Sequence, residues 1–328
     1  MKSFIKESKF LVTGGAGFIG SNLVDYLMDH DAKYVTVLDN LSNGLLENIK
    51  DHLEKPNFEF IKGDIRDLDT CKRAVKGVDY VSHQAALGSV PRSIHDPITT
   101  NQVNISGFLN VLLAAKDEPS VKKMVYAASS STYGDSISLP KVEGEEGKPI
   151  SPYAVTKAVN EMYADVFSKV YGFHTIGLRY FNVFGPRQNP DNPYAAVIPI
   201  FCSKVLSKDN PSINGDGETS RDFTYVDNAI LANILGLING SKIKSHKVYN
   251  VACGERISLN EVISELSIIS GDEIKPIYQP ERAGDVKHSM ASIDKINSEL
   301  GYEPKVKFKE GLKRVFFWYE KKLRFKQN

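Results

Sequence analysis

The first 180 residues alternate between short apolar runs and stretches with the periodicity of helices. The runs are rich in β-branched and aromatic residues and lie at residues 10–13, 34–38, 58–61, 80–82, 124–127 and 175–178. Continuous apolar strands separated by helices are typical of a parallel sheet that helices cover on both faces. The pattern therefore predicts an α/β fold with a doubly wound parallel sheet, and ligands are expected at the carboxyl ends of its strands.

This alternation ends after Arg179, where a segment rich in Pro, Asn and Gly runs from Asn182 to Gly217. Beyond it we expect a strand at residues 248–251, a helix at about 259–269 and a terminal helix from about residue 310. We interpret the chain as two lobes, residues 1–181 and a smaller C-terminal α/β lobe at residues 182–328. Segments around 225–250 are candidates to pack back onto the first lobe.

The composition is that of an ordinary globular protein. The chain has 328 residues, of which 41% are apolar and 25% charged, and its formal net charge is +1. This balance gives no overall field that would attract nucleic acid or an anionic membrane. The N-terminal segment lacks the apolar core of a signal peptide, and no apolar run is long enough to cross a bilayer. We therefore expect a cytoplasmic protein with no nucleic-acid or membrane partner.

Cysteine and histidine usage adds little chemistry. Cys71, Cys202 and Cys253 are far apart and odd in number, which favours free thiols in a reducing compartment. The seven histidines are scattered, without cysteine or carboxylate partners at ligand spacing, so no metal site is predicted.

A glycine-rich turn follows the first predicted strand. Gly14, Gly17 and Gly20 lie in the segment 13–20, directly before a helical pattern. Missing side chains let such a turn approach a pyrophosphate, which then meets free N–H groups and the positive end of the helix dipole. Asp39 closes the second strand, where a carboxylate can accept hydrogen bonds from the adenosine ribose and would repel a 2′-phosphate. This context predicts a Rossmann domain that binds NAD rather than NADP.

Tyr153 and Lys157 are four residues apart in a second motif. Ser151 and Pro152 precede them as a helix start, so both side chains should lie on one face of that helix. A free phenol has a pKa near 10, whereas a nearby ammonium and a nicotinamide cation favour the phenolate. The spacing thus predicts a tyrosine that serves as a base beside the nicotinamide. The predicted cofactor-binding residues are Gly14, Gly17, Phe18, Ile19, Asp39, Asn40, Asp64, Ile65, Gln84, Ala85, Ala86, Asn104, Tyr153 and Lys157.

Small hydroxyl residues end the fifth predicted strand, in the segment Ala128-Ser129-Ser130-Ser131-Thr132-Tyr133-Gly134-Asp135. Together with the glycine turn, the Tyr153/Lys157 pair and the segments 179–186 and 221–223, it resembles the extended short-chain dehydrogenase/reductase family over nearly the whole chain. The resemblance implies that Tyr153 is the general base and acid, that Lys157 is its electrostatic partner and that Ser129 bridges Tyr153 and a sugar 4-hydroxyl.

The chemistry at the serine triplet favours one reaction among those of the family. Dehydratases and decarboxylases that resemble this framework carry carboxylates near that hydroxyl, whereas this chain has Ser130 and Ser131. The simplest cycle is then oxidation of a sugar C4 by NAD and re-reduction on the opposite face, as in a 4-epimerase. The segments 87–93 and 288–289 resemble the hexose 4-epimerases that prefer N-acetylated UDP-hexosamines, including bacterial UDP-N-acetylglucosamine 4-epimerases.

This resemblance implies a nucleotide-sugar site in the second lobe. Arg221 and Arg282 match diphosphate-binding positions, and arginine is suited to that task. Ser130 and Asn182 would lie near the N-acetyl or diphosphate end, and the small Ser289 would leave room for an acetamido group. The predicted substrate-binding residues are Ser89, Ser129, Ser130, Ser131, Tyr153, Asn182, Val197, Arg221, Arg282, Asp285 and Ser289.

Three alternatives remain open from the sequence. The sugar could be UDP-N-acetylglucosaminuronate or UDP-glucose, because one pocket position discriminates by only about 1–3 kcal/mol. A catalytically silent NAD-binding regulator is the alternative of another class, and the intact Tyr153/Lys157 pair argues against it.

The resemblance also suggests a homodimer in which helices near residues 99–116 and 153–170 pack as a four-helix bundle.

Overall fold

The computed structural model describes residues 1–190, 195–281 and 287–327. Its centre is a seven-stranded sheet of order β11-β6-β5-β4-β1-β2-β3, in which every neighbouring pair is parallel. The predicted doubly wound parallel sheet is therefore confirmed. Its strands are β1 (Lys9–Thr13), β2 (Tyr34–Asp39), β3 (Phe58–Lys62), β4 (Tyr80–His83), β5 (Lys123–Ser129), β6 (Thr175–Tyr180) and β11 (Lys247–Val251).

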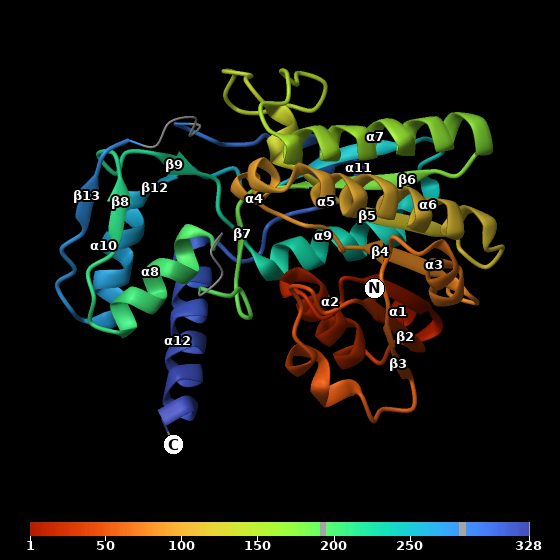
Figure 1. Cartoon of the computed structure of the whole chain (residues 1–328), viewed down its shortest axis with the longest axis horizontal. Coiled ribbons are helices and arrows are strands. Elements are labelled where there is room, and N and C mark those ends of the chain that lie inside the picture. Colours follow the sequence, from red (N-terminus) through yellow and green to blue (C-terminus); the bar gives the residue numbers. More distant parts are fainter. Residues whose placement is uncertain (191–194, 282–286, 328) are drawn as a thin grey trace.

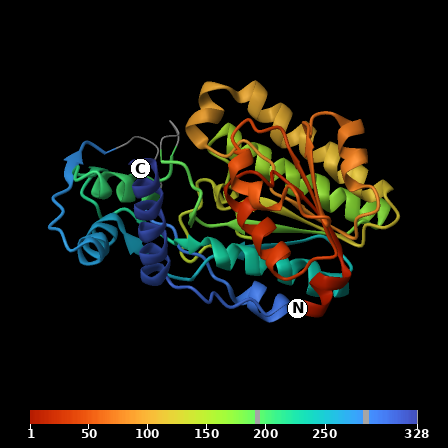
Figure 2. The same ribbon diagram turned by 90° about the horizontal axis from the view of Figure 1, so that it is seen from below.

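Helices cover both faces of this sheet (Figures 1 and 2). Successive side chains of a strand point to opposite faces, so Phe10 and Val12 of β1 join one apolar cluster and Leu11 joins another. The first cluster includes residues of α2 (Phe18–Asp29) and α9 (Val226–Asn239). The second includes residues of α3 (Leu68–Val75), α6 (Phe108–Asp117) and α7 (Pro152–Tyr171). Burial on both faces explains why these strands are continuously apolar.

Shorter helices precede or connect the strands of the first lobe. They are α1 (Lys2–Glu7), η1 (Leu46–His52), α4 (Val90–His95), α5 (Pro97–Asn101), η2 (Gln102–Gly107) and η3 (Ser130–Tyr133). Because α5, η2 and α6 follow one another without a break, residues 97–117 form one long helical segment beside α7.

The second lobe lies at the left of Figure 1, around α8, α10 and α12. After β10 the chain returns to the first lobe, where α9 covers the sheet and β11 pairs with β6. The remaining elements are β7 (Val183–Phe184), α8 (Val197–Leu206), β8 (Ser212–Asn214), β9 (Ser220–Arg221), β10 (Thr224–Tyr225), η4 (Gly240–Lys242), β12 (Ile257–Ser258), α10 (Leu259–Ser270), β13 (Ile277–Gln279), α11 (Asp294–Leu300) and α12 (Phe308–Gln327).

An aromatic cluster packs where the second lobe begins. Phe184, Phe223 and Phe308 are buried, and the ring centroids of Phe223 and Phe308 are 5.4 Å apart. Tyr225 packs edge-on against Phe184 at 5.6 Å. Aromatic contacts of this kind add to the free energy of apolar burial, so the cluster holds β7, β10 and α12 together. Among the described residues, no helix is both long and apolar enough to cross a membrane.

Candidate active site

A cavity of about 490 Å³ opens at the carboxyl ends of the parallel strands. Residues following β1, β2, β3 and β4 and the last residues of β5 line it, together with α7 and the start of the second lobe, as the fold predicts for a ligand site. The predicted residues that line it are Gly14, Gly17, Phe18, Ile19, Asp39, Asn40, Asp64, Ile65, Gln84, Ala85, Ala86, Ser129, Tyr153, Lys157 and Asn182.

The glycine turn closes the inner wall of the cavity. Gly14 has φ 68°, and a Cβ there would lie 2.7 Å from the backbone nitrogen of Ala85. A Cβ on Gly20 would lie 2.1 Å from the carbonyl oxygen of Gly14. Gly17 is the N-cap of α2 and supplies no side-chain cap, so the first N–H groups of α2 remain for a ligand. The turn therefore fits a dinucleotide pyrophosphate.

Asp39 lies at the end of β2, in the wall next to this turn. Its two carboxylate oxygens accept hydrogen bonds from the backbone N–H groups of Ala16 at 3.0 Å and Leu41 at 2.8 Å. Burial raises the pKa of Asp39, and these two hydrogen bonds oppose the rise. Each oxygen keeps further lone pairs, so the fixed carboxylate can also accept hydrogen bonds from a ribose.

Two other predicted cofactor residues already have protein partners. The carboxylate of Asp64 accepts two side-chain bonds from Arg66 and one from Asn40, and the Arg66 bond is the main reason that the pKa of Asp64 is lowered to about 2. Gln84 donates to Ser82 and Asn233 within the sheet layer. Both residues line the cavity, but a ligand would have to share or displace these bonds.

Tyr153 and Lys157 project from the first turns of α7. The Ser151 hydroxyl accepts the Ala154 N–H at 3.1 Å and Pro152 occupies the first helical position, which fixes where the helix begins. The Lys157 ammonium donates to the carbonyl oxygen of Ala127 on β5 at 2.7 Å and lies 5.9 Å from the centroid of the Tyr153 ring. The predicted pair therefore lies in one cavity, directly beside the end of β5.

Burial dominates the protonation of this pair. It raises the pKa of Tyr153, while a hydrogen bond with Ser129 acts in the opposite direction. Burial also lowers the pKa of Lys157 to about 8, against the field of Glu161. The sequence led us to expect that Lys157 and a nicotinamide cation together favour the phenolate, and this stays a prediction. In the structure desolvation is the largest influence on the pKa of Tyr153, and the ammonium of Lys157 is bonded to the carbonyl oxygen of Ala127.

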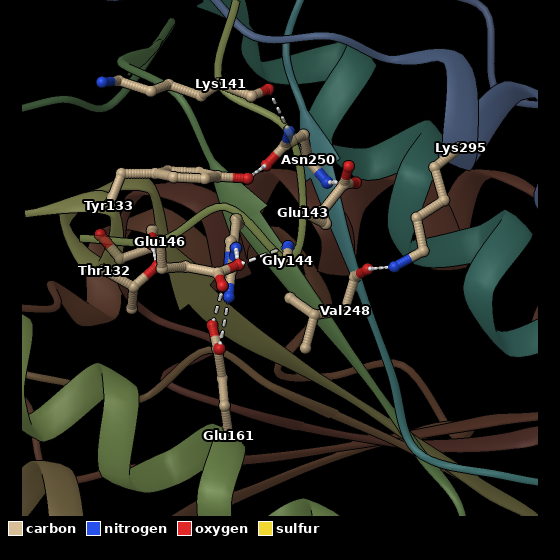
Figure 3. Close-up of polar contacts among 12 residues, drawn as sticks. Thr132, Tyr133, Lys141, Glu143, Gly144, Glu146, Glu161, Val248, Asn250 and Lys295 are labelled. Carbon is tan, nitrogen blue, oxygen red and sulfur yellow. Dashed lines mark hydrogen bonds and ion pairs between the residues drawn. The ribbon is translucent and has the colours of Figure 1, made fainter. Parts of the chain in front are cut away.

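A buried ionic cluster anchors α7 one turn beyond Lys157 (Figure 3). Glu161 accepts two hydrogen bonds, at 2.9 and 2.7 Å, from the guanidinium of Arg179 on β6. Arg179, only 4% exposed, also contacts Glu146 in the loop that leads to α7. Bidentate pairing of this kind fixes orientation as well as distance, so the cluster sets the position of the helix that carries Tyr153.

Only some of the residues predicted to bind the sugar nucleotide line the cavity. The Ser129 hydroxyl accepts hydrogen bonds from the N–H of Ser131 at 3.1 Å and from its hydroxyl at 2.9 Å. Asn182, with φ 36°, donates to the carbonyl oxygen of Asp222 at 3.1 Å. Arg282 and Asp285 lie outside the described residues. Other predicted site residues are described by the structure but do not line the cavity: Ser89, Asn104, Ser130, Ser131, Val197, Arg221 and Ser289.

Several of these residues have clear structural partners. The Asn104 amide bonds the backbone of Leu87 through both its oxygen and its nitrogen, and thereby supports the loop that follows β4. The Ser89 hydroxyl accepts the N–H of Arg92 and caps α4. The Ser289 N–H donates to the carbonyl oxygen of Ser220, which places Ser289 beside Arg221 on β9.

The sequence prediction missed two parts of the cavity. The segment after Asp39 contributes Ser42, Asn43, Gly44, Leu45 and Asn48. The Leu45 N–H and the Asn48 side-chain amide both donate hydrogen bonds to the carbonyl oxygen of Ala16. The polar, glycine-containing turn after the second strand was the available signal. The segment after β7 contributes Arg187, Gln188 and Asn189. No group of His, Cys, Asp or Glu among the described residues could hold a metal ion.

The fold and the cavity define a class of protein: a dinucleotide-dependent enzyme with a tyrosine and a lysine in the cavity at the carboxyl ends of the strands. The NAD dependent epimerase/dehydratase family matches residues 10–252. The chain therefore belongs to this family, and its cofactor is NAD.

Individual relatives agree with this assignment. A UDP-glucose 4-epimerase of Mycolicibacterium smegmatis is 34% identical over 95% of this chain and 98% of its own. The structure of a UDP-N-acetylglucosamine 4-epimerase from Methanobrevibacter ruminantium, bound to UDP-N-acetylmuramic acid, is 41% identical with a TM-score of 0.89, covering 96% of this chain and 99% of that one. A UDP-glucose 4-epimerase from Thermus thermophilus, in complex with NAD, is 34% identical with a TM-score of 0.83, covering 95% and 98%.

Proposed function

We propose that this protein interconverts UDP-N-acetylglucosamine and UDP-N-acetylgalactosamine by inverting C4 through a transient 4-keto sugar. The coarser assignment, an NAD-dependent 4-epimerase of UDP-hexoses, is supported by the family and by the relatives named above. The observation that carries the reaction type is the grouping of Ser129, Tyr153 and Lys157 at one end of the cavity.

These residues can move the proton of a sugar 4-hydroxyl. Tyr153 takes the proton as general base and returns it as general acid, and Ser129, bonded to Tyr153, bridges the phenol and the sugar oxygen. Lys157 orients the nicotinamide ribose and supplies positive charge near the phenol. NAD held in this cavity would supply the acceptor and donor of the C4 hydride, and the positive charge of its oxidised form would act against the effect of burial on the Tyr153 pKa.

The distribution of carboxylates argues against elimination of water. Among the described residues that line the cavity, Asp39 and Asp64 are the only carboxylates. They follow β2 and β3, whereas Ser129 ends β5. Strands lie about 4.8 Å apart, so the three steps from β5 to β2 correspond to roughly 14 Å. A carboxylate at that distance cannot act on the C5 or C6 proton of a sugar held at Tyr153.

Residues of the second lobe support the proposal that the substrate is an N-acetylated sugar. Ser289 is small and lies beside Arg221, which we propose contacts the diphosphate of the UDP-sugar. The relative that is 41% identical carries the name of a UDP-N-acetylglucosamine 4-epimerase. UDP-glucose is the second candidate, because other relatives are named for it.

The test is conversion of UDP-GlcNAc into UDP-GalNAc by the purified protein without added NAD, followed by NMR of the sugar. UDP-glucose and UDP-N-acetylglucosaminuronate serve as parallel substrates. A dehydrated or oxidised sugar in place of the C4 epimer contradicts the proposed reaction. A faster reaction with either parallel substrate contradicts only the proposed sugar.

We further propose that the protein is a homodimer. Along α7, Val155, Val159, Met162, Val166 and Val170 recur at helical spacing, and Met162 and Val170 are 67% and 65% exposed. An apolar stripe of this kind indicates an interface. Val166→Glu should convert the dimer into a monomer in light scattering, whereas Ile268→Glu, at an exposed position on α10, should not. A monomeric wild-type protein contradicts the proposal.

A further inference from the structure

Two buried polar atoms beside the glycine turn have no partner within the protein. Among the described residues, Arg187 Nη1 and Gln188 Oε1 are the buried side-chain atoms that lack a hydrogen bond. Both residues line the cavity that receives NAD. Leaving a guanidinium nitrogen buried without an acceptor costs free energy, so such an atom in a ligand cavity indicates a ligand contact.

The segment that carries Arg187 is fixed against the first turn of α2. The side-chain amide of Asn22 donates both to the carbonyl oxygen of Phe18 at 2.8 Å and to that of Pro186 at 3.2 Å. Since one nitrogen bonds both oxygens, the residue before Arg187 lies within about 6 Å of the first helical residue. Phe18 and Ile19 supply the N–H groups that the fold offers to a pyrophosphate.

The side chain of Arg187 is held from the same helix. One guanidinium nitrogen, Nη2, is paired with Asp25, which also accepts a hydrogen bond from His52 at 2.7 Å. Nη1 belongs to the same planar guanidinium and has no hydrogen-bond partner in the described part of the chain. The backbone of Arg187 has φ 71°, a conformation that costs free energy for a residue with a Cβ and is found at sites where function requires it.

We propose that Arg187 Nη1 donates a charge-assisted hydrogen bond to the diphosphate of bound NAD. The ligand chemistry is a diphosphate, which UDP-sugars also contain. The attachment of Arg187 to α2, through Asn22 and Asp25, favours the dinucleotide. Arg187 is then a cofactor-retaining residue supplied by the segment after β7, and Asp25 is the positioning residue that orients its guanidinium. The inference concerns NAD alone and does not depend on which sugar the enzyme uses.

The experiment measures NAD and UDP binding separately, by calorimetry on protein freed of cofactor. Arg187→Met should weaken NAD binding roughly 10- to 100-fold and leave UDP binding unchanged, because hydrogen bonds to charged groups are the strong ones. Arg187→Lys keeps the charge without the planar fork and should weaken NAD binding less. The loss in Arg187→Met should shrink at high salt, since a charge contact is screened.

Asp25→Asn is the matched control, because it breaks the same ion pair and retains the guanidinium. Because it loosens only the orientation of the guanidinium, it should weaken NAD binding by less than Arg187→Met does. Unchanged NAD affinity in Arg187→Met overturns the proposal, as does a loss of UDP affinity alone, which would assign the guanidinium to the substrate. An equal loss in Asp25→Asn also overturns it, because the ion pair rather than the diphosphate contact would then be responsible.

Discussion

The dinucleotide end of the cavity and its proposed sugar end are assembled differently. Turns that directly follow β1, β2 and β4 form the dinucleotide end, and backbone bonds such as those to Asp39 fix its side chains. The sugar end combines Ser129 of β5 and Tyr153 of α7 with the start of the second lobe. Local turns form the end that we propose for the cofactor, whereas the proposed sugar end depends on how the two lobes pack. Substitutions at the two ends should therefore fail in different ways.

The largest effect, on turnover, is expected for a substitution of Tyr153. Tyr153→Phe removes the hydroxyl that we propose exchanges a proton with the sugar, so turnover should fall by about 10²- to 10⁴-fold. Bound NAD should remain, since the glycine turn and Asp39 are untouched. Initial rates and the NAD content of the purified variant check both statements. A variant that turns over at the wild-type rate would show that another group moves the proton.

The next effect concerns the cluster that positions α7. Arg179→Ala leaves Glu161 and Glu146 without their buried cation, which should cost about 3–5 kcal/mol in the free energy of unfolding. Arg324→Ala removes an exposed helix pair with Glu320 and should cost less than about 1 kcal/mol. Urea unfolding of both variants measures the difference. Equal losses would mean that the cluster does not anchor the helix.

The third prediction concerns His83, which should make the stability of the fold depend on pH. Its ring bonds the Thr13 hydroxyl at 2.7 Å, and burial, with the nearby charge of Lys157, lowers its pKa to about 3. The unfolded chain binds a proton below about pH 6.5, so the neutral ring stabilises the fold above that pH. Its contribution is lost as the pH falls towards 3.

Between pH 7 and pH 5 this loss is about 2 kcal/mol for one such histidine. His246, with a pKa lowered to about 4 by burial, acts in the same direction. His83→Asn should therefore flatten the decline of the melting temperature between these pH values, and His95→Asn, at the exposed end of α4, should not. An unchanged slope in the His83 variant would contradict the assignment.

The smallest effect is expected on the sugar side. Ser289→Tyr fills the space that we propose for the acetamido group, so the ratio of kcat/KM for UDP-GlcNAc over UDP-glucose should fall roughly tenfold. NAD content and stability should stay as in the wild type, because Ser289 touches the β9 segment and not the glycine turn. A proportional loss for both sugars would show that residue 289 does not select between them.

The sequence predicted most of the sheet because burial on both faces produces continuous apolar strands. It also predicted the glycine turn and the Tyr153/Lys157 spacing, since each depends on the backbone geometry of one short segment. Its expectation that Lys157 and a nicotinamide cation together favour the Tyr153 phenolate stays a prediction, and in the structure burial is the largest influence on the pKa of Tyr153. Spacing along a helix gives proximity, but desolvation depends on every segment that packs around the group.

Contacts between distant segments were decided only by the packed chain. Nothing in the sequence places Pro186 against α2 or pairs Arg187 with Asp25, 162 positions apart. Asn104 was predicted to bind the cofactor, and the structure shows its amide bonded to the loop after β4. Short-range patterns determine elements and turns because they repeat with the period of the backbone. Long-range polar partners carry no period, so only the packing of the sheet, its helices and the second lobe determines them.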